Sequence, residues 1–250
     1  MQVTEHSPAN YHTLYSILFF PKFVNLKGRF FMEFSSFLQA LVPIALLSCI
    51  LTAAGSLWID HLYGKSTEDL LSFPEQMAIR ARFRKPLLFA LLAFCFWKAW
   101  ALPIATATLL FLIVIISALA FVTITDFEQY VIFDAMLLPL AVVGLGYVVQ
   151  MHLPLGQHIA AALGGGCLFF LLTVLTRGAI GGGDIKLIAV LGLWLGIRPL
   201  VQVIAYGLLA GGAAALIMLL AKQKNRHSYF AYGPYFALSA IGILLGWLPF

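Results

Sequence analysis

Long runs without charged side chains alternate with short polar stretches along this 250-residue chain. The run at 34–59 contains no Asp, Glu, Lys or Arg, and its 26 residues exceed the roughly 20 that a helix needs to cross a bilayer. Two longer runs follow at 86–125, where Lys98 is the sole formal charge, and at 135–176, which has none. Runs of this length predict membrane-spanning helices, whereas strands of an outer-membrane barrel would alternate polar and apolar positions.

Turn residues divide the longer runs into pairs of spans. The run at 86–125 folds back near Pro103, and the run at 135–176 is broken by polar and turn residues at 152–158. The segment after Lys186 divides at Arg198-Pro199, and a last apolar segment extends from Ala231 to Leu248. The pattern predicts an all-α, polytopic transmembrane helical bundle of about eight spans.

The composition supports a membrane protein that contacts lipid. Hydrophobic residues make up 62% of the chain and charged residues 10%, against about 45–50% and 25% in a soluble domain. The formal charge of +5 comes from basic residues at segment ends, which predicts membrane orientation and no nucleic-acid partner. The three cysteines stand apart in apolar runs, so we expect small buried side chains, and neither a metal site nor disulfides.

Four regions follow from this pattern. We expect an N-terminal extension at 1–33, a first span at 34–59, a short cytoplasmic polar segment at 60–85 and a transmembrane core at 86–250. The extension has its basic residues after a short aromatic stretch, unlike a signal peptide. The polar segment has room for one amphipathic helix, from Ser66 to Arg84.

The distribution of basic residues predicts the orientation in the membrane. If the loops after spans one, three, five and seven share a side, that side carries ten of the fifteen Lys and Arg residues. Because Lys and Arg are enriched in cytoplasmic loops, these loops are predicted to face the cytoplasm.

Candidate chemistry lies in the few acidic residues of the second half. After Glu75 the chain has four: Asp126, Glu128, Asp134 and Asp184. They occur in two connections that the count above places on one side, and Asp184 follows three consecutive glycines, Gly181, Gly182 and Gly183. Ionisable groups at membrane depth are costly and tend to serve a function.

Asp126 and Asp184 suggest a hydrolase. Two carboxylates facing each other across a water can act as base and acid, so that neither a nucleophilic residue, a metal nor a cofactor is required. The glycines would leave room for a substrate strand. A purely structural interpretation is also open, in which the glycines form a hinge, Asp184 an N-cap and Lys186 an interface anchor.

Several ordered motifs resemble one family. The segment Gly181-Gly182-Gly183-Asp184-Ile185-Lys186-Leu187 is similar to the GxGDxKL signature of type IV prepilin peptidases, a branch of the GxGD aspartyl proteases. Asp126 and Asp134 are eight residues apart and are similar in spacing to two acidic positions of the family. Phe133 stands where the family usually has a proline. Two further segments are similar to family motifs, Gly55-Ser56-Leu57 and Tyr232-Gly233-Pro234-Tyr235-Phe236-Ala237-Leu238.

The resemblance implies an inner-membrane endopeptidase that removes the basic leader of prepilins or pseudopilins. It places the catalytic pair on Asp126 and Asp184, on the cytoplasmic side, and gives Asp134, Lys186 and the three glycines supporting or substrate-binding positions. Glu128 is expected to be a solvated loop carboxylate.

One departure narrows the expected activity. Bifunctional family members have a longer cytoplasmic region with two zinc-binding CxxC pairs, linked to methylation of the new pilin N-terminus. Residues 60–85 contain no cysteine, so we expect peptidase activity without methyltransferase activity.

Two other classes remain open. Asp126 and Asp184 could line a proton or cation pathway of a transporter or channel, with the glycines as a broken helix. The chain could also be a noncatalytic component of a secretion or pilus machine, although the presence of both aspartates argues against this.

Overall fold

The computed structural model describes residues 26–66, 70–178, 180–221 and 231–248, which form helices and turns. Eight predicted spans correspond one to one with eight helices, so the predicted all-α bundle is confirmed. In chain order these helices are α2 (Leu26–Lys65), α4 (Arg84–Trp100), α5 (Thr106–Gln129), α6 (Asp134–Gln150), α7 (Leu155–Leu175), α8 (Gly182–Leu195), α9 (Ile197–Leu220) and α10 (Gly233–Leu244).

Four of these helices are long and apolar enough to cross a membrane. They are Leu41–Lys65 within α2, Thr106–Gln129, Leu155–Leu175 and Ile197–Leu220, while α6 and α10 are shorter apolar helices. The protein is therefore a multi-pass membrane protein, with lipid expected around its outer helices.

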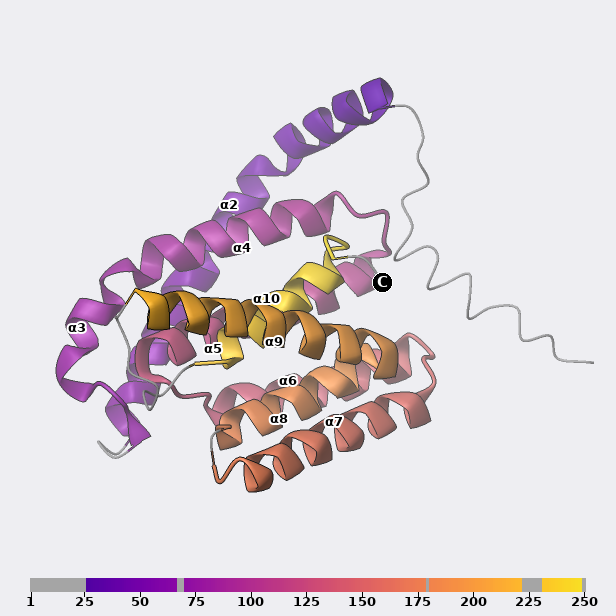
Figure 1. Cartoon of the computed structure of the whole chain (residues 1–250). Coiled ribbons are helices and arrows are strands. Elements are labelled where there is room, and N and C mark those ends of the chain that lie inside the picture. The colour runs from indigo at the N-terminus through magenta and orange to yellow at the C-terminus, as the bar shows by residue number, and fades with distance from the viewer. Residues whose placement is uncertain (1–25, 67–69, 179, 222–230, 249–250) are drawn as a thin grey trace, which may run out of the picture.

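Helix α5 forms the centre of the bundle. In its most apolar window 56% of the residues are buried, against 17% in α9, and Ile115, Ile116 and Leu119 have no exposed surface. Figure 1 shows α2 and α4 on one side of α5 and the group of α6, α7 and α8 on the other. Helix α10 packs on α5 and α9, and Gly233 at its start lies against Asp126 in the last turn of α5.

Glycines let the outer helices approach closely. A Cβ at Gly192 of α8 would lie 2.6 Å from the Ala161 carbonyl carbon of α7. On α9, Gly207 faces the ring of Phe236 and Gly211 faces Tyr232, both near the start of α10. Small residues four positions apart commonly bring membrane helices together in this way, and here they fix α10 against α9.

Helix α8 is also held to α6 by a buried tryptophan. Trp194 Nε1 donates a hydrogen bond of 2.8 Å to the carbonyl oxygen of Leu140. A Cβ at Gly144 would lie 2.5 Å from this nitrogen, so the glycine makes room for the indole ring. The contact sets the position of α8, the helix that begins near Asp184.

The structure differs from the expected boundaries in two places. Helix α2 is longer than the predicted span at both ends, because it begins at Leu26, inside the expected N-terminal extension, and continues past residue 59 to Lys65. Residues 70–83 do not form one amphipathic helix but three short pieces, Pro74–Gln76, Met77–Arg80 and Ala81–Phe83. Pro74 cannot continue a helix from the preceding residues, because it lacks an N–H and restricts its neighbour. Of the expected N-terminal extension, residues 1–25 lie outside the described residues.

The expectation for the cysteines was right for one of the three. Cys95 is buried, whereas Cys49 and Cys167 are exposed on the outer surface of the bundle. A lipid-facing position suits an apolar thiol as well as a core position does, so the hydrophobic pattern alone did not separate the two.

Candidate active site

Asp126 lies in the last turn of α5, near the end of the most deeply buried helix. The helix ends because Tyr130 adopts a left-handed conformation, with φ of 55°, and its N–H donates to the Asp126 carbonyl oxygen at 3.0 Å. Asp126 is 5% exposed. The chain then turns through residues 130–133 and enters α6 at Asp134.

Asp184 lies in the first turn of α8. Gly181 occupies the N-cap position, with Gly182 and Gly183 as the first two helical residues, so Asp184 is the third and not the N-cap. Its backbone N–H donates to the Gly181 carbonyl oxygen at 3.1 Å, and the Gly181 amide interacts with its carboxylate. An acidic residue in this turn is stabilised by the free amides and dipole of the helix N-terminus.

Ile132 connects the two aspartate-bearing segments. A Cβ at Gly183 would lie 2.9 Å from Ile132 Cβ, and a Cβ at Gly233 would lie 2.9 Å from Ile132 Cδ1. The same Cβ at Gly233 would lie 2.5 Å from Asp126 Oδ2. The ends of α5, α8 and α10 therefore meet around one isoleucine, with both carboxylates at this junction.

The two carboxylates interact electrostatically and retain free hydrogen-bonding capacity. The charge of Asp184 acts on Asp126, and the Gly233 amide interacts with the Asp126 carboxylate. Within the described part of the chain, Oδ2 of Asp126 and Oδ1 of Asp184 are buried without a hydrogen-bond partner. Buried oxygens of this kind require an explanation, and a water or a substrate held between them would supply the missing partner.

The three glycines differ in how much space surrounds them. A Cβ added at Gly182 would have no atom within 4 Å, one at Gly181 would approach Asp184 Oδ2 at 3.3 Å, and Gly183 is packed on Ile132. Open space for a substrate backbone is therefore found at Gly182, whereas Gly183 is required for packing.

Asp134 and Lys186 form an exposed ion pair beside this junction. Lys186 Nζ donates to the two carboxylate oxygens of Asp134 at 2.7 and 2.8 Å, with more than half of each side chain exposed. Asp134 is the first residue of α6, where a negative charge is favourable. The pair links α6 to α8 at the edge of the site, so Asp126 and Asp184 are the buried carboxylates of the junction around Ile132.

The expectation for Glu128 was wrong, because this residue is 6% exposed and belongs to a buried ionic cluster. Arg84 Nε donates to Glu128 Oε1 at 2.9 Å and Nη2 donates to Oε2 at 2.7 Å. Tyr63 donates to Glu128 at 3.1 Å, and Asp60 pairs with the other side of Arg84. Sequence reasoning missed the cluster because its members lie on three different helices; the adjacent charges Arg84 and Lys85 at the start of an apolar run indicated only a segment end.

The short polar segment is fixed over the end of α5. Phe73 N–H donates to Gln129 Oε1 at 2.9 Å, and Gln129 Nε2 returns a bond to the Phe73 carbonyl oxygen at 3.1 Å. Arg80 donates to the Glu128 carbonyl oxygen at 2.5 Å and lies 3.6 Å from the centre of the Phe73 ring. The Arg80 bond satisfies a carbonyl group that the end of a helix leaves without a partner, and together these contacts hold the turn that carries Asp126.

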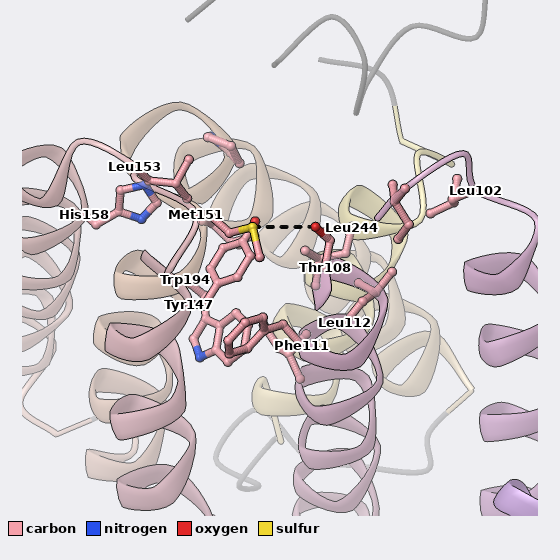
Figure 2. Close-up of a pocket in the computed structure, with 14 residues that line it drawn as sticks. Leu102, Thr108, Phe111, Leu112, Tyr147, Met151, Leu153, His158, Trp194 and Leu244 are labelled. Carbon is pink, nitrogen blue, oxygen red and sulfur yellow. Dashed lines mark hydrogen bonds between the residues drawn. The ribbon is translucent and has the colours of Figure 1, made fainter. Parts of the chain in front are cut away.

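A separate cavity of about 130 Å³ lies at the other end of α5. Figure 2 shows Thr108, Phe111 and Leu112 on one wall and Tyr147, Met151 and Trp194 on the other. His158 also lines it and is held by a 2.8 Å contact from Nδ1 to the Leu193 carbonyl oxygen. Neither aspartate lines this cavity, which is apolar and distinct from the carboxylate junction.

Fold and site together define a helical membrane protein with paired buried carboxylates at one end of the bundle. Residues 113–216 match the sequence profile of the "Type IV leader peptidase family". The matched part of the chain includes Asp126, Asp134 and Asp184, and the resemblance drawn from the motifs is confirmed.

Curated relatives carry the name "Prepilin leader peptidase/N-methyltransferase". The protein from Neisseria gonorrhoeae is 35% identical over 134 residues, which cover 51% of this chain and 43% of the relative. The one from Aeromonas salmonicida (strain A449) is 29% identical over 183 residues, covering 68% and 60%. The one from Bacillus subtilis (strain 168) is 36% identical over 121 residues, covering 45% and 47%.

The chain spans about half the length of the curated relatives it matches, from 43% to 60% in these three cases. No solved structure matches the chain.

Proposed function

We propose that this protein is a membrane aspartyl endopeptidase that removes the basic leader of prepilins or pseudopilins. The observation that carries the proposal is the junction of α5, α8 and α10, where Asp126 and Asp184 are buried and each keeps a carboxylate oxygen without a partner among the described residues. The family of residues 113–216 and the names of the relatives support the substrate class.

Asp126 and Asp184 would divide the work of general base and general acid. The ionised carboxylate removes a proton from water as the water oxygen attacks the peptide carbonyl carbon. The protonated carboxylate donates a hydrogen bond to the carbonyl oxygen and later transfers its proton to the leaving amine. Like charges held close together favour the singly protonated pair that this division requires.

The surroundings of the pair suit a peptide substrate. Gly182 leaves open space next to Asp184, and the first-turn amides of α8 lie at the site, where they favour a negatively charged or carbonyl oxygen. Asp134 and Lys186 are assigned a supporting role, since their ion pair holds the start of α6 to α8 and is itself exposed.

We assign the protein to the inner membrane with the carboxylates facing the cytoplasm. The bias of basic residues supports this orientation, and a membrane-anchored substrate with a cytoplasmic basic leader would reach the site without leaving the bilayer. In this organisation the apolar part of α2 is the first span, the segment at 70–83 faces the cytoplasm and residues 86–250 form the peptidase core.

Methyltransferase activity is not part of the proposal. The polar segment at 60–85 has no cysteine, and its residues 70–83 are engaged in holding the end of α5 through Phe73 and Arg80. Incubation with a labelled methyl donor and cleaved pilin tests this point directly, and incorporation of label would contradict it.

Leader cleavage by purified protein in detergent tests the proposed function. We expect wild-type protein to shorten a prepilin at one bond, and Asp126→Asn and Asp184→Asn each to lower the rate by about 10³-fold or more, with the double variant no slower than either single one, as for groups that act as a unit.

Asp134→Asn serves as the matched control, because it removes a nearby carboxylate that pairs with Lys186 at the surface. It should retain most of the activity. Cleavage that survives the loss of both Asp126 and Asp184 would exclude the proposed mechanism, and cation or proton flux through proteoliposomes that depends on them would favour a transporter.

A further inference from the structure

One face of α10 forms a shallow groove on the outer surface of the bundle. Tyr235, Leu238, Ser239 and Gly242 follow each other at spacings of three, one and three residues, so they share one side of the helix. Ala210 of α9 lies across from them, and the groove encloses about 260 Å³, ending at Trp247 and Leu248.

The groove begins next to the carboxylates. Gly233, two residues before Tyr235, is the residue at which an added Cβ would lie 2.5 Å from Asp126 Oδ2. The Tyr235 ring packs edge-to-face on Phe127, the neighbour of Asp126, with 6.2 Å between ring centres. From Tyr235 to Gly242 the groove runs along about 10 Å of helix, away from Asp126 and into the apolar part of the bundle.

The lining suits another helix better than it suits a polar ligand. Its surface is almost entirely apolar. Ala210 and Ser239 are small, which allows a second backbone to approach closely beside them, whereas Gly242 is covered by Leu248. Helices α9 and α10 already use this device at Gly207 and Gly211. Ala210 is exposed and lies one residue from Gly211, so the same type of surface continues outward from the α9–α10 contact.

We propose that this groove receives the apolar helix that anchors the substrate in the membrane, on the opposite side of the scissile bond from the basic leader. The inference rests on the proposed function. If the scissile peptide bond of the substrate is held at Asp126 and Asp184, the membrane-embedded part of the substrate must lie along a face of the bundle next to these residues. The α9–α10 groove is such a face: it starts at Tyr235, two residues after Gly233, and continues toward Trp247 and Leu248. Recognition then divides between the carboxylate junction, which holds the bond, and the groove, which holds the helix.

Filling the groove with a large side chain tests the proposal. Ala210→Trp places an indole in it, and Ala205→Trp is the matched control, an exposed alanine on the same helix, about 140° around its axis. Each variant is assayed on a prepilin with its apolar helix and on a soluble peptide that contains the leader and the scissile bond but lacks that helix.

We expect Ala210→Trp to lower kcat/KM for the prepilin by about tenfold or more, since the helix loses its packing surface, and to leave the peptide unaffected. Ala205→Trp should match wild type on both substrates. If the two variants cleave the prepilin at equal rates, the proposed role of the groove is wrong and the proposed function is unaffected. Absence of cleavage by wild type, or cleavage that persists in Asp126→Asn, would instead overturn the proposed function.

A photo-crosslinking residue at position 210 or 205 gives a second readout, which remains valid even if the tryptophan variants fail to fold. Prepilin should be captured from position 210 and not from 205, in the Asp184→Asn background that retains substrate. Capture of lipid alone, or of a second copy of this chain, from position 210 would contradict the proposal.

Discussion

Ile132 is the residue on which the carboxylate-bearing segments meet. It follows the left-handed turn at Tyr130 and fills the space left by two glycines, Gly183 and Gly233. A β-branched side chain is stiff, so it sets the separation of α8 and α10 at this point. The geometry at Asp126 and Asp184 therefore depends on an apolar residue and two missing side chains as much as on the carboxylates.

Gly233→Ala should reduce the proposed cleavage without unfolding the protein. The added methyl would lie 2.5 Å from Asp126 Oδ2 and 2.9 Å from Ile132 Cδ1, so the carboxylate must shift, and a displacement of about 1 Å can cost roughly 10²-fold in rate. Leader cleavage and thermal unfolding in detergent are the measurements.

Gly212→Ala provides the comparison, because nothing lies within 4 Å of a Cβ at that exposed position of α9. It should leave both cleavage and unfolding unchanged. A Gly233→Ala variant as active as Gly212→Ala would show that the carboxylate position tolerates the methyl group.

Sequence reasoning singled out residues whose energetic cost depends only on their neighbours in the chain. Asp126 and Asp184 stand out because a charge bordering a long apolar run is costly wherever the chain folds. Glu128 does not stand out in the sequence, because the partners that allow its burial are distant in the chain. Arg84 is 44 residues away and Tyr63 is 65 residues away. Long-range pairing leaves no periodic signal, so its loop-like surroundings led to a wrong expectation.

At the scale of the helices, the Arg84 cluster joins three elements. Tyr63 and Asp60 belong to α2, Arg84 begins α4 and Glu128 ends α5. Arg84 also donates to the Ser56 carbonyl oxygen at 3.3 Å. The hydrophobic pattern predicted these three helices correctly, but their relative placement at this end is set by ionic contacts that each helix alone does not indicate.

Arg84→Met should destabilise the protein strongly. It leaves the Glu128 carboxylate buried without its cation, and breaking a buried pair in this way costs about 3–5 kcal/mol. The double variant Arg84→Met, Glu128→Gln removes the unpaired charge and should recover part of the loss. The free energy of unfolding, obtained by titrating detergent-solubilised protein with a denaturing detergent, is the measurement.

Lys186→Met breaks the exposed pair with Asp134 and should cost only about 0–1 kcal/mol, because solvent screens both groups. Equal losses for Lys186→Met and Arg84→Met would mean that the buried cluster contributes no more than a surface ion pair.

Across the whole molecule, the two ends of the bundle differ in chemistry. One end gathers Asp126, Asp184, the Asp134–Lys186 pair and the Arg84 cluster. The other end is formed by turns such as 151–154 and encloses the apolar cavity with Thr108 and Trp194. This separation of polar and apolar chemistry agrees with the two-sided distribution of basic residues, which is the basis of the proposed orientation.

The orientation can be measured with single cysteines in a background carrying Cys49→Ala, Cys95→Ala and Cys167→Ala. Gln76→Cys lies at the carboxylate end and Gly156→Cys at the other end, both at exposed positions. If the carboxylates face the cytoplasm, a membrane-impermeant maleimide applied to intact cells should label Gly156→Cys, and should label Gln76→Cys only after the membrane is opened. Each variant is first shown to unfold like the cysteine-free parent, so that a change in labelling reports the side of the membrane. The reverse pattern would place Asp126 and Asp184 outside the cytoplasm, where a basic leader held on the cytoplasmic side could not reach them.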